Sequence, residues 1–251
     1  MITVVCKPDD PASKNMFNFI KNESGFDKAL IIDNLNYSNK NSDLVIFLSK
    51  HESKNKIDCI TCHAPGNFGN ADFGGENNKL SVSNAIIQTE CLRRMLIFKQ
   101  RMNLSVDCCF EATHHGPSNN VPCLFVEIGS GPELWEQREL GSGIGSIVLS
   151  LIKDYDKLMK LKKKTIALGI GGTHYTTSFS KLVQKDENVC FGHICPKYQL
   201  NNLDKNMFVQ MLDKTIPKPT LVVFDNSVNS AKRNEVIDWC NEFNLEVMKL
   251  K

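Results

Sequence analysis

The chain has 251 residues, of which 41% are hydrophobic and 23% are charged, and its formal net charge is +2. A charge so close to zero argues against a protein that is coated for non-specific nucleic-acid binding. No apolar stretch reaches the roughly 18 residues that a membrane-spanning helix needs. We find no linker or internal repeat, so we expect one domain over residues 1–251, with no membrane or DNA partner.

The cysteines and the first residues together predict an intracellular protein. The apolar run Ile2 to Cys6 is too short for a secretory signal and meets a Lys-Pro-Asp-Asp sequence at once. Many of the ten cysteines lie within apolar runs, which is typical of reduced thiols rather than of a disulfide framework. We therefore expect free cysteines and a cytoplasmic location.

Short apolar runs alternate with amphipathic stretches along the chain. Expected strands lie at residues 2–6, 30–32, 44–48, 57–61, 106–110, 124–126, 165–170, 189–191, 220–224 and 245–250. Expected helices begin near residue 10, span 82–102 and 144–161, and include residues 207–212 and 236–243. This alternation predicts an α/β fold with a mixed, largely parallel central sheet flanked by helices.

Histidines occupy a consistent place in this pattern, because all six follow expected strands. They are His51, His63, His114, His115, His174 and His193. Histidines scattered over a core or a surface would also occur in helices. Ligands of open α/β sheets bind where strand ends open into loops, so strand ends on one edge of the sheet would bring these side chains together.

Reactive side chains are most frequent at the ends of two apolar runs. The first, residues 106–110, leads into Glu-Ala-Thr-His-His-Gly-Pro at 111–117, and the second, residues 124–126, carries Glu127 and ends in a glycine turn. We interpret them as neighbouring buried strands whose ends form a metal or acid–base site. Imidazole and carboxylate groups can bind a metal ion, and they can also act in general acid–base chemistry. Two surface histidines before a turn would be the simpler explanation.

Three shorter motifs need separate interpretation. The sequence at 59–63, Cys-Ile-Thr-Cys-His, has the spacing of a redox or haem motif. We reject both functions, because residues three apart in a strand point to opposite faces. The glycines at 141–145 lack a preceding strand, so we expect them to open a helix and allow close packing. The sequence 169–174 follows a strand and precedes a helix, so its N–H groups could hold an anion.

Seven segments, found in family order, resemble the archaeal and plant type of D-aminoacyl-tRNA deacylase. They are residues 10–13, 48–53, 61–67, 111–117, 125–130, 169–175 and 192–194. The string at 111–117 is the most specific. Asn226-Ser227 departs from a Lys-Gly pair that is frequent in the family. The resemblance implies hydrolysis of the ester between a D-amino acid and the 3′ end of tRNA, a chiral proofreading step in translation quality control. It also implies a zinc cofactor and a fold related to the phosphorylase/peptidyl-tRNA hydrolase group.

The histidine pattern, a lysine-rich stretch at 153–164 and the resemblance together suggest roles for individual residues. The candidate catalytic groups are His114, His115, Glu111 and Glu127. The candidate zinc ligands are His63, His114, His115, His174 and His193. Contacts to the substrate and the tRNA are expected from His51, Asn67, Gly171, Gly172, Thr173, Lys162, Lys163 and Lys164. The lysines equally suit a solvated helix face.

Other functions use the same groups. The expected partner is the acceptor end of D-aminoacyl-tRNA, bound by a monomer. A zinc-dependent amidase or peptidase on small substrates is an alternative, and so is a non-catalytic module that binds the tRNA end. A metal-free route assisted by the terminal ribose hydroxyl also remains open. Metal content and the relative rates on D- and L-aminoacyl-tRNA separate these alternatives.

Overall fold

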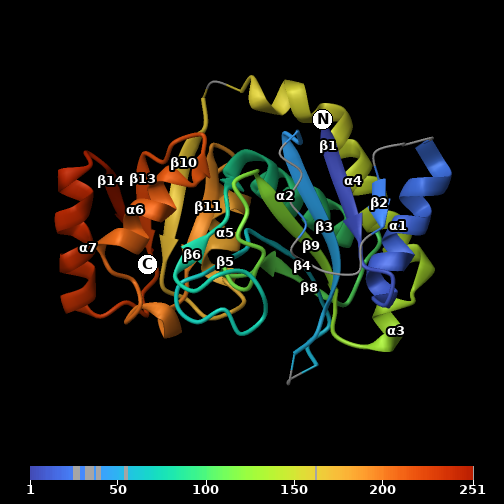
Figure 1. The fold of residues 1–251 in the computed structure, drawn as a ribbon, viewed down its shortest axis with the longest axis horizontal. Helices are drawn as coiled ribbons and strands as arrows, with labels where there is room; N and C mark the ends of the chain where they lie inside the picture. Colours follow the sequence, from blue (N-terminus) through green and yellow to red (C-terminus); the bar gives the residue numbers. More distant parts are fainter. Residues whose placement is uncertain (25–28, 32–36, 38–40, 54–55, 162, 251) are drawn as a thin grey trace.

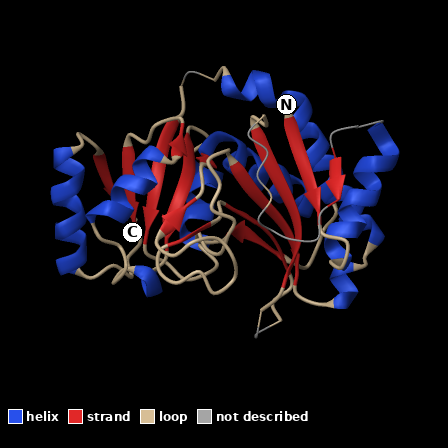
Figure 2. Cartoon of the chain, in the orientation of Figure 1, coloured by secondary structure: helices blue, strands red, loops and turns tan. Residues whose placement is uncertain are grey.

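Two β-sheets organise the chain and lie side by side (Figures 1 and 2). The computed structural model describes residues 1–24, 29–31, 37, 41–53, 56–161 and 163–250. The larger sheet has the spatial order β2-β1-β3-β9-β4-β8, and the smaller sheet has the order β11-β10-β13-β14. Neighbouring strands in both sheets are parallel, except that β4 runs antiparallel to β9. The predicted mixed, largely parallel α/β architecture is therefore confirmed.

The elements have the following bounds. The larger sheet contains β2 (Ala29–Ile31), β1 (Ile2–Cys6), β3 (Leu44–His51), β9 (Cys123–Gly129), β4 (Cys59–His63) and β8 (Asp107–Phe110). The smaller sheet contains β11 (Val189–Cys195), β10 (Thr165–Ile170), β13 (Leu221–Phe224) and β14 (Glu246–Lys249). Two short pairs are β5 (Gly66–Asn67) with β6 (Lys79–Leu80), and β7 (Ser83–Asn84) with β12 (Thr215–Ile216). The helices are α1 (Pro11–Ser24), α2 (Ala85–Arg101), α3 (Pro132–Trp135), α4 (Arg138–Met159), α5 (Thr177–Lys185), the 3₁₀ turn η1 (Lys197–Gln199), α6 (Lys205–Asp213) and α7 (Ser230–Glu242).

Most expected elements appear close to their predicted positions, and the differences concern where strands end. Strand β3 continues to His51, and β4 ends at His63, so both histidines belong to the strands rather than to the loops that follow. Strand β11 continues through His193 to Cys195. Residue 32, the end of the second expected strand, lies outside the described residues.

Side-chain alternation gives the larger sheet two different faces. One face packs against α1, α2 and α4, and Ile46, Ile60 and Val126 enter a continuous core there, which extends to Ile166 of the smaller sheet. Successive residues of a strand point to opposite faces, so the residues between these positions form the other face. Two of them, Phe47 and Phe125, stack with their ring centroids 4.7 Å apart. The candidate catalytic histidines and glutamates lie on this second face.

The glycines at 141–145 lie in the first two turns of α4, which begins at Arg138, earlier than expected. A Cβ atom at Gly141 would collide with Asn15 of α1, and one at Gly143 would collide with the Phe98 ring of α2. The predicted role in close packing is confirmed, because these glycines let three helices approach one another.

The cysteines of the chain are all free, and Cys59 and Cys62 lie within β4, so the expectation of reduced thiols is confirmed. No helix in the described part of the chain combines the length and the apolar character that crossing a membrane requires.

Candidate active site and metal centre

Five histidines and two glutamates gather on the second face of the larger sheet. Strand ends supply His51 and His63, β9 supplies Glu127, the segment after β8 supplies Glu111, His114 and His115, and the loop after β10 supplies His174. The ring centroid of His114 lies 4.2 Å from that of His63, 4.4 Å from that of His115 and 4.6 Å from that of His174. The predicted convergence of histidines is therefore present for five of the six.

The route to this convergence differs from the predicted one. The strands that lead to Glu111 and Glu127 are not neighbours, because β4 lies between β8 and β9 and runs antiparallel to β9. Their carboxyl ends therefore lie at opposite edges of the sheet. Pairing of Thr61 with Glu127 and of His63 with Phe125 places these side chains over the middle of one face. The expected meeting of strand ends at one edge is wrong, and the site forms across the sheet face.

Three imidazoles are oriented in the same way, by main-chain oxygens. The Nδ1 atom of His63 lies 3.3 Å from Ala64 O, that of His114 lies 2.8 Å from Ala112 O, and that of His115 lies 2.6 Å from Gly116 O. A carbonyl oxygen only accepts, so each Nδ1 carries the donated proton, and Nε2 holds the lone pair whenever the ring is neutral. Burial lowers the pKa of His63, but Glu127 outweighs it and raises that pKa, so metal binding at this ring must displace a proton more often than at His114 or His115. Metal-binding histidines are commonly held in this way, with one ring nitrogen donating to the protein and the other free for the metal.

The free nitrogens of these rings can meet at one point. His63, His114 and His115 each offer a ligand atom, and these atoms lie within 4.8 Å of one another. The buried Nε2 of His63 has no hydrogen-bond partner among the described residues, and the 3.7 Å to Glu127 Oε1 is too long for a hydrogen bond. An unpartnered buried ring nitrogen is costly unless it binds a proton donor or a metal. The donor set fits a three-histidine zinc site.

The two glutamates are buried, being 1% and 3% exposed, and they share one histidine. The Nδ1 atom of His51 lies 3.1 Å from Glu111 Oε1 and 3.2 Å from Glu127 Oε2. The Nε2 atom of His174 lies 2.8 Å from Glu111 Oε2. Burial raises the pKa of Glu111, but the contacts with His174 and His51 outweigh it and hold that pKa well below its usual range. The pKa of Glu127 is lowered in the same way, against burial, by His51 and His63.

The histidines differ in charge according to their neighbours. Burial lowers the pKa of His51, but Glu111 and Glu127 outweigh it and raise that pKa to about 10. Burial and the neighbouring imidazoles lower the pKa of His115 to about 4 and that of His114 well below its usual range. In the metal-free protein, His51 is thus a cation between two carboxylates at neutral pH. His114 and His115 are neutral, as metal ligands must be.

The sixth histidine, His193, does not join the cluster. It lies inside β11, is fully buried, and its Nε2 donates to Ser81 O at 2.9 Å. Its Nδ1 lies 3.1 Å from the hydroxyl of Thr113, the residue before His114. Both ring nitrogens are therefore engaged within the protein. The expectation of a ligand at His193 fails on geometry, because β11 does not end before this residue, and His193 instead supports the segment that carries His114.

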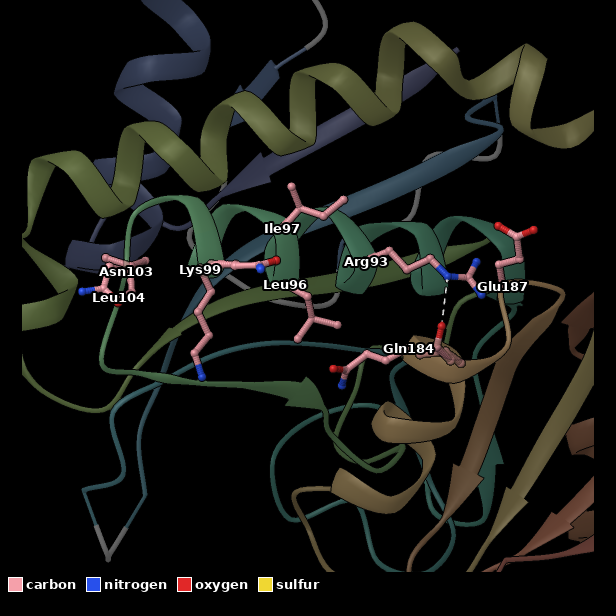
Figure 3. A pocket seen from close by; sticks show the side chains of 10 residues that line it. Arg93, Leu96, Ile97, Lys99, Asn103, Leu104, Gln184 and Glu187 are labelled. Atoms are coloured by element: carbon pink, nitrogen blue, oxygen red, sulfur yellow. Dashed lines mark hydrogen bonds between the residues drawn. The ribbon is translucent and has the colours of Figure 1, made fainter.

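A cavity of about 270 Å³ opens beside the histidines. It is lined by Gly66, Asn67, Phe68, Asn70, Asp72, Phe73, Thr113, His114, His115, His174, Tyr198 and Gln199. A second hollow, of about 680 Å³, lies between α2 and α5 (Figure 3). Its lining contains no histidine, and its Arg93 donates to the main-chain oxygens of Val189 and Asp186 at 2.9 and 3.2 Å. The smaller cavity is the candidate substrate site, because it alone of these two reaches the histidines.

The residues expected to contact substrate or tRNA fall in several places. His51 lies inside the carboxylate network, where its Nε2 is 2.7 Å from the Tyr175 hydroxyl. Asn67 lines the cavity, but its amide group donates to Gly74 O at 2.9 Å and to Glu76 O at 3.2 Å. Its observed contacts therefore hold a loop.

The glycine loop after β10 uses its donors internally. The N–H of Gly171 donates to Cys195 O, that of Gly172 donates to Ser227 Oγ, and the hydroxyl of Thr173 donates to Tyr175 O. None of the three lines the 270 Å³ cavity, and the two glycine N–H groups are not free to hold an anion. A role for this loop in tRNA binding stays a prediction.

The basic stretch lies at the opposite end of β10 from the histidine cluster. Lys162 lies outside the described residues, whereas Lys163 is exposed and Lys164 donates to Glu187 O at 2.7 Å. These lysines precede β10, and His174 follows it (Figure 1). A strand of this length spans about 20 Å at roughly 3.3 Å per residue. Any contact they make with tRNA would therefore lie well away from the ester.

Sequence reasoning did not single out three aromatic residues. Tyr175 contacts His51, while Tyr198 and Phe73 line the cavity. Tyr175 directly follows His174, so its position in the motif was the available signal. Nothing in the sequence marks Phe73 or Tyr198, because exposure of an aromatic ring is not visible in a pattern.

A mixed α/β fold with a buried histidine–glutamate cluster that could bind a metal, open to a small cavity, is typical of a hydrolase site. The family model described as D-aminoacyl-tRNA deacylase matches residues 38–248. The chain is 35% identical over 214 residues to the D-aminoacyl-tRNA deacylase of Sulfurisphaera tokodaii, covering 85% of this chain and 86% of that protein. It is 33% identical over 252 residues to the D-aminoacyl-tRNA deacylase of Ignicoccus hospitalis, covering 98% of each. This chain belongs to the D-aminoacyl-tRNA deacylase family.

A solved structure shares this fold over nearly the whole chain. A crystal structure described as a conserved protein of unknown function superimposes with a TM-score of 0.86 at 25% identity. The match covers 99% of this chain and 95% of that one. The predicted family, and with it the expectation of a hydrolytic enzyme, is confirmed.

Proposed function

We propose that this protein hydrolyses the ester bond of D-aminoacyl-tRNA in the cytoplasm, releasing the D-amino acid and the tRNA, with zinc held by His63, His114 and His115. The observation that carries the proposal is the shared orientation of these three rings. Each donates its Nδ1 proton to a main-chain oxygen, and each offers a ligand atom that lies within 4.8 Å of those of the other two. Bound there, zinc would act as a Lewis acid and lower the pKa of water to about 7.

The two glutamates take different roles in this proposal. Glu111 contacts His114 and His174, both of which line the cavity, whereas His51 and His63, the partners of Glu127, do not line it. We assign Glu111 as the general base, because it is the carboxylate closer to the open side of the cluster. Glu127 orients His51, whose Nδ1 lies 3.2 Å from Oε2 of Glu127.

His174 completes the acid–base pair. Its side chain is 32% exposed and lines the cavity, and its Nε2 lies 2.8 Å from Glu111. A proton that Glu111 takes from water can pass through this contact to Nε2 of His174, while Nδ1 of the same ring gives its own proton to the departing ribose oxygen. Tyr198, whose hydroxyl lies 3.4 Å from His174 Nδ1, helps to hold the ring in place.

We propose that the site distinguishes D- from L-aminoacyl esters by where each substrate's side chain points. Two enantiomers share the ester and the ammonium group, so a pocket that fixes both groups points the two side chains in different directions. Steric exclusion of one direction can then discriminate more strongly than a missing methylene, which contributes only about 1–3 kcal/mol. The cavity of about 270 Å³ is small enough for such exclusion.

The test is single-turnover deacylation of D-tyrosyl-tRNA and L-tyrosyl-tRNA, with and without a chelator. We expect rapid hydrolysis of the D-ester, little hydrolysis of the L-ester, and loss of activity on chelation that zinc restores. Comparable rates on the two esters would indicate a generic esterase instead. Activity that persists after the metal is removed and measured as absent would favour the ribose-assisted route.

A further inference from the structure

Two aromatic side chains stand exposed at the wall of the cavity that reaches the histidine cluster. Phe73 is 79% exposed, and Tyr198 is 56% exposed. Large apolar side chains are usually buried, so a pair of exposed rings at one cavity suggests a ligand surface.

The loop that carries Phe73 is held firmly although the ring is not packed. The Asn67 amide donates to Gly74 O and Glu76 O on one side of the loop. Gly116, next to His115, donates its N–H to Phe73 O at 3.4 Å. Gly74 and Gly75 adopt φ values of 87° and 84°, and they approach Gly116 so closely that a Cβ there would collide with them. The fold therefore fixes the Phe73 backbone against the turn that bears His115.

Tyr198, which follows a strand of the smaller sheet, also contacts the histidine cluster. It lies in η1, directly after β11, and its hydroxyl is 3.4 Å from Nδ1 of His174. The main chain of Phe73 is thus bonded to Gly116, the neighbour of His115, and the hydroxyl of Tyr198 contacts His174. The two residues are therefore held beside the segment 114–116 and the loop of His174, respectively, at the cavity that both line.

This arrangement suits one part of the substrate. We infer that Phe73 and Tyr198 bind the 3′-terminal nucleobase of the tRNA by stacking, an inference that rests on the proposed function. Single-stranded RNA ends are recognised largely by aromatic side chains that stack on unpaired bases. The terminal base is joined to the ribose that carries the ester, so it must lie beside the histidines when the ester does.

The experiment measures binding of uncharged tRNA to the zinc-loaded protein, using tRNA that ends in -CCA and the same tRNA shortened to -CC. Stacking of one base contributes between about fivefold and about 150-fold in affinity. We expect the unsubstituted protein to prefer the -CCA form within that range. Phe73→Leu, which keeps apolar bulk but removes the aromatic face, and Tyr198→Leu should each reduce the preference, and Phe73→Trp should retain it.

Phe243→Leu is the matched control. Phe243 is partly exposed at the end of α7 and does not line the cavity, so its substitution should leave the preference unchanged. Equal affinity of the unsubstituted protein for both tRNAs would overturn the inference, and so would a full -CCA preference in Phe73→Leu and Tyr198→Leu.

Two further measurements distinguish base stacking from a contact with the amino acid, and base binding from deacylation. If Phe73→Leu slows deacylation of D-tyrosyl-tRNA but not of D-alanyl-tRNA, the ring contacts the amino acid and base stacking is refuted. The second measurement is hydrolysis of D-tyrosyl-tRNA by the same preparations of the unsubstituted protein, which tests the proposed function independently of base binding. Absent hydrolysis together with a -CCA preference that depends on Phe73 would refute the proposed function while supporting base binding.

Discussion

Replacing His51 by glutamine should change how the stability of the metal-free protein depends on pH. His51 is 5% exposed and lies between two buried carboxylates, which raise its pKa from 6.5 to about 10 against the effect of burial. The folded protein therefore keeps this proton at pH values where the unfolded chain has lost it. By linkage, this contribution to stability is complete below pH 6.5 and is lost as pH rises towards 10.

The magnitude follows from the width of that window. One retained proton changes the free energy of unfolding by roughly 1.4 kcal/mol per pH unit. Thiols of the unfolded chain are about half ionised near pH 8.5, so the His51 contribution is best measured between pH 6.5 and 8.5. We expect the unsubstituted protein to lose about 2.5 kcal/mol more over this interval than His51→Gln does.

Urea unfolding of chelator-treated protein, followed at several pH values in this interval, measures the difference directly. His63, whose pKa is also raised against the effect of burial, chiefly by Glu127, contributes with the same sign in both proteins, so the quantity compared is the difference between the two pH profiles. Parallel pH profiles for the two proteins would refute the assignment of His51 as a cation bridging the two glutamates.

Three further predictions address the metal, the tRNA and the helix packing. His114→Ala should lose bound zinc and deacylation while retaining its circular dichroism spectrum, and full activity of a metal-free preparation of this variant would contradict the proposal. Replacing Lys163 and Lys164 by alanine should flatten the log–log dependence of tRNA affinity on salt, by about 0.7 to 0.9 in slope for each phosphate that is no longer neutralised; an unchanged slope would make them a solvated surface. Gly143→Ala should destabilise the fold by about 1–3 kcal/mol, because the new methyl group collides with the Phe98 ring. Thermal unfolding measures this, and a midpoint at or above that of the unsubstituted protein would show that the helices can separate at no cost.

The positions of the histidines in the sequence predicted the cluster but not its geometry. Apolar runs followed by histidines predicted that all six histidines converge, and five of them do, namely His51, His63, His114, His115 and His174. The direction of β4 could not be predicted, because nothing in residues 59–63 distinguishes a parallel strand from an antiparallel one. That choice depends on packing against β9 and β8, which are distant in sequence. Local pattern therefore identified the participants, and long-range pairing decided which sheet surface they occupy.

His193 shows a second limit of sequence reasoning. A glycine at position 192 suggested that the strand ended there, but Ile194 and Cys195 continue it. In the structure, the Cβ of a residue at 192 would collide with Thr215, so this glycine serves a close approach to a neighbouring segment rather than a turn. A glycine can thus mark crowding within a strand as well as the end of one.

The main-chain oxygens that orient His63, His114 and His115 have a consequence for variation in this site. They belong to Ala64, Ala112 and Gly116, and every amino acid possesses such an oxygen. Exchanging a neighbouring side chain cannot delete the acceptor, as it would where a carboxylate orients the ring. Sensitivity to mutation should instead follow the path of the backbone. It should be highest at Gly116, where any side chain would displace the loop that bears Phe73 and tilt His115 away from its partners.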